Sequence, residues 1–180
     1  MLGFGTVGEG TYRMLIDNAD EIGRKTGARG EVVRIGIKDS SKPRSLPGEM
    51  FTTDLESVVR DPNIDVICEL MGGESPAGEM VELALSLGKH VVTANKELIA
   101  KHGSRLITKA RELELDLHFE AAVGGGIPVV QPLKHQLAGN DVIKLMGILN
   151  GTTNYILTQM EENGADFSDA LAEAQAKGYA

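Results

Sequence analysis

Three glycines near the amino terminus have the spacing of a phosphate-binding turn. Gly3, Gly5 and Gly8 form the pattern G-x-G-x-x-G, and the residues that follow have the apolar spacing of a helix. In such a pattern the first glycine makes a tight turn, the second leaves room for a diphosphate, and the third lets the helix pack closely. The helix N-terminus then offers N–H groups to the phosphates. We therefore expect a dinucleotide to bind here, although a glycine turn without a ligand would have the same pattern.

A pair of charged residues ends the apolar run that follows this helix. Asp39 could accept a hydrogen bond from the 2′-hydroxyl of an adenosine ribose, which would favour NAD. Lys38, together with Lys42 and Arg44, could instead pair with a 2′-phosphate, which would favour NADP. These residues alone leave the choice between the two cofactors open, and an ordinary solvated loop is the third interpretation.

Three further segments carry residues that could do chemistry. Lys96 lies in the first turn of an expected helix, where its charge opposes the helix dipole. The lysine either binds an anionic or carbonyl group of a ligand or simply faces solvent. Glu120 precedes the glycine run 124–126, and a carboxylate with freed carbonyls could hold a hard cation or form a hinge. The segment 150–155 begins another helix, whose first amides could bind a carboxylate or only be capped.

Alternating strand and helix patterns must position these residues. Short apolar strands between helices indicate an α/β fold with a doubly wound parallel sheet of the Rossmann type. The pattern changes after residue 123, so we expect a NAD(P)-binding domain over residues 1–123 and the incomplete beginning of an α+β catalytic and dimerisation domain over residues 124–180. The expected strands are 31–38, 64–71, 90–93, 115–123 and 142–149, and the expected helices are 6–24, 54–60, 76–87, 96–102, 104–112, 127–138, 152–162 and 168–177, the last capped by Ser168.

Both ends of the sequence look cut. Only Met1 and Leu2 precede Gly3, where a Rossmann sheet has a strand of about five residues, so we expect the first strand to be largely missing. The other end stops directly after an expected helix, without a returning strand. These features lead us to expect a fragment of a longer protein.

Composition narrows the classes of function. The 180 residues have a net charge of −8, which gives no basic surface for nucleic acid or an anionic membrane. Aromatic residues are only 4% and tryptophan is absent, which argues against stacking on single-stranded nucleic acid. The one cysteine, Cys68, lies among apolar residues, and the four histidines have no metal-ligand spacing. With no apolar run of about 18 residues and no leader pattern, we expect a cytoplasmic protein that binds neither membrane nor nucleic acid.

Five motifs together resemble those of homoserine dehydrogenases, in the same order and over nearly the whole chain. They are GFGTVG at 3–8, ELMGG at 69–73, TANK at 93–96, EAAVGGGIP at 120–128 and GILNGTTNYIL at 147–157. The resemblance implies an oxidoreductase that interconverts L-homoserine and L-aspartate 4-semialdehyde with NAD(P), in threonine, methionine and isoleucine biosynthesis. Another amino-acid dehydrogenase of the same fold, or a non-catalytic nucleotide-binding module, is the alternative.

The resemblance also implies roles for single residues. Lys38 matches a position where the family often carries a base that selects NADP, which favours NADP over NAD. Lys96 matches a catalytic lysine at the junction of cofactor and substrate, where it mainly positions the substrate. The implied cofactor-binding residues are Gly3, Phe4, Gly5, Thr6, Val7, Gly8, Lys38, Asp39, Gly72, Lys96 and Gly178; the substrate-binding residues are Lys96, Asn150, Gly151, Thr152 and Tyr179; and a sodium ion is implied at Glu120 with the carbonyls of Val123, Gly125 and Ile127.

The family signature that begins at residues 174–180 continues with a substrate-binding glutamate and then a catalytic aspartate and lysine. The resemblance therefore places all three beyond Ala180. Hydride transfer to a carbonyl also needs a proton donor for the developing alkoxide. We therefore expect the 180-residue chain to be inactive by itself, and the complete protein to act on a small molecule as a homodimer or homotetramer.

Overall fold

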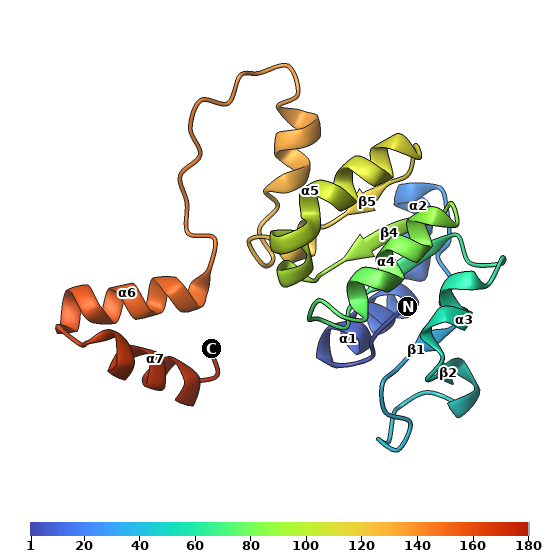
Figure 1. The fold of residues 1–180 in the computed structure, drawn as a ribbon, viewed down its shortest axis with the longest axis horizontal. Coiled ribbons are helices and arrows are strands. Elements are labelled where there is room, and N and C mark those ends of the chain that lie inside the picture. Colours follow the sequence, from blue (N-terminus) through green and yellow to red (C-terminus); the bar gives the residue numbers. More distant parts are fainter. Residues whose placement is uncertain (180) are drawn as a thin grey trace. The chain divides into compact units, whose positions relative to one another are not determined.

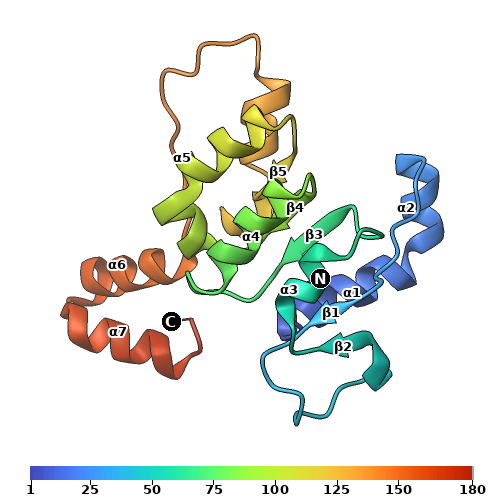
Figure 2. The same cartoon turned by 45° about the vertical axis from the view of Figure 1, so that its right-hand side comes forward.

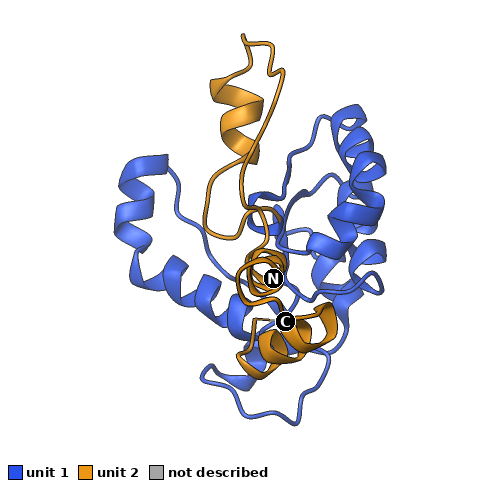
Figure 3. Ribbon diagram, turned by 90° about the vertical axis from the view of Figure 1, so that its left-hand side faces the viewer, with its two compact units in different colours: residues 1–122 blue, residues 123–180 orange. Residues whose placement is uncertain are grey.

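The computed structural model describes residues 1–179. The chain divides into two compact units, unit 1 (Met1–Ala122) and unit 2 (Val123–Ala180) (Figure 3). Each unit has its own apolar core and is described by itself. Within the described residues, no helix has the length and apolar character needed to cross a membrane.

Unit 1 alternates helices with short strands (Figure 1). Its strands are β1 (Ile35–Gly36), β2 (Phe51–Thr52), β3 (Val66–Glu69), β4 (His90–Thr93) and β5 (Leu117–His118). Its helices are α1 (Thr6–Asp17), α2 (Ala19–Thr26), α3 (Leu55–Arg60), α4 (Ala77–Ser86) and α5 (Lys96–Glu112), with 3-10 turns η1 (Gly48–Met50) and η2 (Glu120–Ala122).

Leu2 holds the sheet of unit 1 together. It pairs in parallel with Gly36 on one side and with Glu69 on the other, so it lies between β1 and β3. Its amide donates to the Cys68 carbonyl at 2.7 Å, and its carbonyl accepts from the Leu70 amide at 2.7 Å. The order is therefore β2–β1–Leu2–β3–β4–β5, with every pairing parallel. This is the 3-2-1-4-5-6 order of a Rossmann sheet, which confirms the expected fold class.

The strand alternation sends side chains to two opposite faces of this sheet. Leu2 and Ile67 face a core formed with α3, α4 and α5. Met1 and Cys68 face the other way, toward a second core that includes Tyr12 of α1. Figures 1 and 2 show α4 and α5 on one face and α1 on the other. Burial raises the pKa of the Cys68 thiol, as expected of a cysteine that packs rather than reacts.

Three expectations for unit 1 were wrong in detail. The single helix over 6–24 is two helices, because Asn18 leaves the helical conformation and its side-chain amide donates to the Met14 carbonyl at 3.1 Å. The helices expected over 96–102 and 104–112 are one helix, since Gly103 is buried inside α5 rather than breaking it. The strands at 31–38, 64–71 and 115–123 shorten to β1, β3 and β5, and the short strand β2 was not expected.

Unit 2 contains α6 (Gly151–Asn163) and α7 (Phe167–Ala176), which pack through Ile156, Ala170 and Ala174. The strand expected over 142–149 is absent from its described residues; no other strand there could pair with the segment, whose apolar side chains lie exposed. The helix expected over 127–138 reduces to the π turn η3 (Pro132–Gln136), which ends where the Leu137 amide donates to the Pro132 carbonyl at 2.9 Å. Asp166 rather than Ser168 caps α7, since its carboxylate accepts from the Asp169 amide at 3.1 Å.

Candidate functional site

The amino terminus of α1 is a set of free backbone donors. The first amides of a helix have no partner within the helix. Gly5 occupies the cap position of α1 and has no side chain to satisfy them. The first bond of the helix runs from the Glu9 amide to the Gly5 carbonyl at 2.9 Å, so the amides of Thr6, Val7 and Gly8 precede it. The positive end of the helix dipole adds to their attraction for an anion.

The three glycines of this turn serve two different purposes. Gly3 has a φ of +98°, and a Cβ there would lie 2.7 Å from the Leu70 carbonyl carbon. A Cβ on Gly8 would lie 2.3 Å from the Gly3 carbonyl oxygen. The fold therefore requires glycine at both positions. Gly5 has an ordinary φ of −90°, and a Cβ there would meet nothing within 4 Å, so the fold does not require glycine and the space beside it is open.

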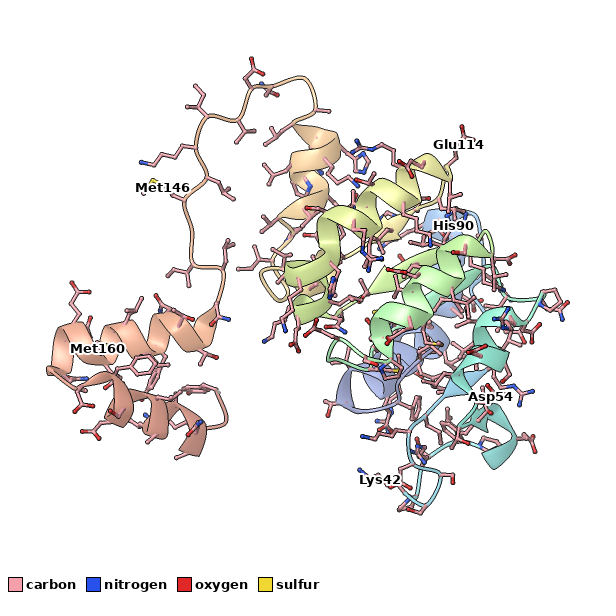
Figure 4. The ribbon with its side chains drawn as sticks, viewed as in Figure 1. Lys42, Asp54, His90, Glu114, Met146 and Met160 are labelled. Carbon is pink, nitrogen blue, oxygen red and sulfur yellow. The ribbon has the colours of Figure 1, made fainter. Side chains whose placement is uncertain are left out.

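The loop after β1 brings cations beside this turn. Phe4 and Glu9 line a cavity of about 400 Å³ together with Lys42, Arg44 and Ser45. Figure 4 shows Lys42 on this loop. The Arg44 guanidinium lies 5.2 Å from the centre of the Phe51 ring, which holds it close to the sheet. Glu9 accepts from the Ser45 hydroxyl at 3.1 Å, so the cavity has one acidic edge.

Asp39 is already engaged by its own loop. One oxygen of its carboxylate accepts from the Ser41 hydroxyl at 2.6 Å and from the Ser41 amide at 2.8 Å. These two hydrogen bonds hold the pKa of Asp39 below its usual range. Its backbone carbonyl accepts from Arg44 at 2.6 Å. Lys38, one residue earlier, is exposed. The structure thus uses Asp39 to shape the loop and leaves the lysine side chain in solvent.

The loop after β3 carries Gly72, which has a φ of +78° and open space where a Cβ would be. The Glu69 side chain is fully buried beneath this loop and accepts from the Met71 amide at 2.8 Å. Its other oxygen accepts from the Thr93 hydroxyl at 2.6 Å. Sequence reasoning assigned Gly72 a role but missed Glu69 and Thr93; the available signal was an acidic residue at the end of an apolar strand.

Lys96 is the first residue of α5 and is exposed. Asn95 caps the helix by accepting from the Leu98 amide at 3.0 Å, and it donates to the Gly73 carbonyl at 2.6 Å. This second bond ties the start of α5 to the glycine loop after β3. Gly3–Gly8, Lys38–Arg44, Gly72 and Lys96 all follow parallel strands, so unit 1 brings them to one edge of the sheet.

Unit 2 brings together two of the expected substrate-binding residues. The Thr152 hydroxyl donates to the backbone carbonyl of Tyr179, and the ring of Tyr179 lies 5.2 Å from that of Tyr155. Gly178, with a φ of +74°, makes the turn that returns the chain after α7. Asn150 caps α6 by accepting from the Thr153 amide at 2.8 Å, and Gly151 begins the helix.

The residues expected to hold sodium lie in η2 and in the turn that follows. Glu120 begins η2. In unit 2, Val123 precedes a turn that contains Gly125 and that is closed by the Ile127 amide donating to the Gly124 carbonyl at 3.2 Å. Among residues 1–179, no three histidine, cysteine, aspartate or glutamate side chains come close enough to hold a metal.

The sheet order and the glycine turn define unit 1 as a dinucleotide-binding domain of the Rossmann class. Residues 3–120 match the family described as "Homoserine dehydrogenase, NAD binding domain", and residues 128–180 match "Homoserine dehydrogenase". The chain therefore belongs to the homoserine dehydrogenase family.

Individual relatives agree with this assignment. A homoserine dehydrogenase of Synechocystis is 47% identical over 183 residues, which cover 100% of this chain and 42% of the relative. One of Pseudomonas aeruginosa is 48% identical over 99% of this chain and 41% of its own length. This chain thus spans about two-fifths of the length of the curated relatives it matches.

Solved structures also resemble this chain. A homoserine dehydrogenase from Thiobacillus denitrificans superposes with a TM-score of 0.89 at 47% identity, over 99% of this chain and 42% of that one. A hyperthermophilic archaeal homoserine dehydrogenase in complex with NADPH superposes with a TM-score of 0.78 at 28% identity, over 99% and 60% of the two chains. The family members are oxidoreductases, and a nicotinamide cofactor fits the domain that unit 1 forms.

Proposed function

We propose that this chain supplies the cofactor-binding part, and the beginning of the substrate-binding part, of an enzyme that interconverts L-homoserine and L-aspartate 4-semialdehyde. The observation that carries the proposal is the open space at Gly5, directly before the uncapped amides of α1. A diphosphate placed there would meet backbone donors and no side chain. The match of both halves of the chain to homoserine dehydrogenases supports the choice of substrate.

We propose NADP as the preferred cofactor. A 2′-phosphate needs cations, and the loop after β1 places Lys42 and Arg44 on a cavity that Phe4 also lines. The bonds from Ser41 occupy one oxygen of the Asp39 carboxylate, which leaves only the other oxygen to accept from a ribose hydroxyl. The similarity to an archaeal homoserine dehydrogenase in complex with NADPH supports the same choice.

When bound, the nicotinamide cofactor would supply or accept the hydride. The residues Gly3, Phe4, Gly5, Thr6, Val7 and Gly8 would hold its diphosphate, and Gly72 would let the loop after β3 approach it. Lys96, exposed on the first turn of α5, binds an oxygen of the substrate and so positions its carbonyl. The substrate-side residues are Asn150, Gly151, Thr152 and Tyr179, with Gly178 contacting the cofactor.

Sodium at Glu120 with the carbonyls of Val123, Gly125 and Ile127 stays a proposal from the resemblance. An oxygen-only donor set suits a hard cation. If sodium binds, NaCl will raise the melting temperature of the protein above that in KCl at equal ionic strength, and Glu120→Gln will remove the difference. Equal melting temperatures in the two salts would exclude the site.

We also propose that the complete protein works in the cytoplasm, as a homodimer or homotetramer, in threonine, methionine and isoleucine biosynthesis. Sedimentation of the complete protein measures its oligomeric state, and a monomer would contradict the proposed assembly. The growth requirements of a strain that lacks the protein test the pathway, and growth without added threonine, methionine and isoleucine would contradict it.

The cofactor site itself is tested by titrating this chain with NADPH and following the nicotinamide fluorescence. Gly5→Val fills the open space beside the α1 amides, so we expect it to weaken binding by at least about tenfold, the effect of losing one charge-assisted hydrogen bond. Gly10→Val is the matched control, because a Cβ at Gly10 also meets nothing within 4 Å but lies one turn further along α1. Equal binding by both variants would refute the proposed site.

A further inference from the structure

Glu69 is a carboxylate in the core of unit 1. Its side chain is fully buried at the end of β3. In the described part of the chain, no lysine, arginine or histidine forms an ion pair with it. Burying an acidic group is costly unless hydrogen bonds replace its hydration. Here the replacement comes from the Met71 amide at 2.8 Å, the Gly72 amide at 3.4 Å and the Thr93 hydroxyl at 2.6 Å.

These bonds form one side of a closed ring of contacts. The Thr93 hydroxyl, which donates to Glu69, accepts from the Asn95 amide at 3.0 Å. The Asn95 side chain donates to the Gly73 carbonyl at 2.6 Å, and Gly73 adjoins the residues whose amides bind Glu69. The ring therefore connects the loop after β3 to the first turn of α5. Every polar side chain in it is buried.

The two segments that the ring connects carry residues of the proposed site. The loop after β3 presents Gly72 and Gly73, both with positive φ and open space where a Cβ would be. The first turn of α5 presents Lys96, directly after Asn95. A simple apolar side chain at residue 69 would fill the core but would leave the amides of Met71 and Gly72 without their acceptor. The need for an acid here is thus explained by the shape of the loop.

We propose that Glu69 is a positioning residue, which acts through Thr93 and Asn95 to hold the Gly72–Gly73 loop and Lys96 in the arrangement that receives the cofactor. This proposal rests on the proposed function, because it takes the edge of the sheet as the nicotinamide cofactor site. The glycine pattern alone does not contain this requirement. In the proposal, a buried carboxylate that does not touch the cofactor helps to set the affinity for the cofactor.

The test uses variants that change the ring without emptying the core. Glu69→Gln keeps the size of the side chain, but its amide group would donate to the Thr93 hydroxyl instead of accepting from it, so that hydroxyl loses its acceptor. Thr93→Val removes the hydroxyl at nearly constant volume, and Thr93→Ser restores it. Val58→Ala is the control for stability, because Val58 is buried in α3 and has no part in the ring of hydrogen bonds.

We expect Glu69→Gln and Thr93→Val each to weaken NADPH binding to this chain by about tenfold, as one lost charge-assisted hydrogen bond would. Thr93→Ser should bind nearly as well as the unchanged chain. Val58→Ala should lower the melting temperature and leave NADPH affinity unchanged. In the complete enzyme the ring variants should raise the KM for NADPH more than they lower kcat.

Two other outcomes would overturn the proposal in different ways. If Glu69→Gln and Thr93→Val only lower the melting temperature, as Val58→Ala does, and NADPH binds unchanged, Glu69 is merely structural while the cofactor site stands. If the unchanged chain does not bind NADPH, the proposed function fails and the role of Glu69 fails with it. Thr93→Val keeps the test decisive even if Glu69→Gln does not fold.

Discussion

A Cβ on Gly8 would lie 2.3 Å from the carbonyl oxygen of Gly3, closer than any real contact of that kind. The first turn of α1 therefore rests directly on the backbone that leaves the central strand position at Leu2. This contact directs the amino terminus of α1 to the carboxyl edge of the sheet. The same edge receives the loops after β1, β3 and β4, so one close backbone contact aligns the helix with the rest of the site.

Gly8→Ala should destabilise the protein, because its methyl group can be accommodated only if α1 moves away from Gly3. We expect the free energy of unfolding to fall by about 1–3 kcal/mol, the usual range for overpacking. Gly5→Ala, which meets open space, should change it by less than about 0.5 kcal/mol. Urea denaturation of both variants measures the difference. Equal stabilities would show that α1 is not packed on Gly3 as the structure has it.

The double variant Lys38→Ala, Lys42→Ala should change the choice of cofactor. If these cations bind the 2′-phosphate, the affinity for NADPH should fall by about tenfold while that for NADH stays the same. The loss should shrink at high salt, since both lysines are exposed. Fluorescence titration with each cofactor measures it, and the double variant Arg24→Ala, Lys25→Ala on α2 controls for the two lost charges. An unchanged ratio of the two affinities would show that neither lysine contributes to the choice between NADPH and NADH.

Local sequence patterns predict how the strands and helices of unit 1 are arranged, but they do not predict where each helix begins and ends. Apolar runs that alternate with helical spacing predict a parallel sheet, and the glycine turn predicts which edge binds a ligand. The break at Asn18 and the continuity of α5 through Gly103 depend on a side-chain hydrogen bond and on burial, which no local pattern reveals.

The remaining differences arise from contacts between segments distant in sequence. The apolar run 142–149 has the composition of a strand, but a strand needs a partner, and the described part of unit 2 supplies none. Glu69 was visible as an acidic residue within an apolar strand, yet its role depends on Thr93, 24 positions later. The sequence thus predicts the glycine turn and Lys96 as site residues, and only the fold reveals what holds them in place.

The contribution of Glu74 to stability should depend on pH. Hydrogen bonds from Lys101 and His102 hold the pKa of Glu74 below its ordinary value of 4.5. A carboxylate with a lowered pKa stabilises the fold above 4.5, and this stabilisation is lost as the pH falls through the lowered pKa. The difference in melting temperature between the unchanged protein and Glu74→Gln should therefore shrink as the pH falls below 4.5 and vanish in more acidic solution.

A matched variant separates this effect from the general loss of one charge. Glu112→Gln removes another glutamate of unit 1, which is exposed at the end of α5 and forms no ion pair in the described part of the chain. We expect it to change the melting temperature less than Glu74→Gln at pH 7. A difference for Glu74→Gln that persists below the lowered pKa would mean that the bonds to Lys101 and His102 do not stabilise the fold.

Lys96→Met should separate cofactor binding from turnover. The lysine is exposed on the first turn of α5, and its ammonium group is the cation we assign to the substrate oxygen. Lys96 is also one of the implied cofactor-binding residues, so its removal should weaken NADPH binding to this chain. The loss should be smaller than the roughly tenfold loss expected of Gly5→Val, because the α1 amides hold the diphosphate. In the complete enzyme it should lower kcat/KM for homoserine by about a hundredfold, the usual loss for one well-placed electrostatic contact. Lys109→Met, on the same helix but bonded to Ser86, is the control, and equal turnover by the two variants would remove Lys96 from the reaction.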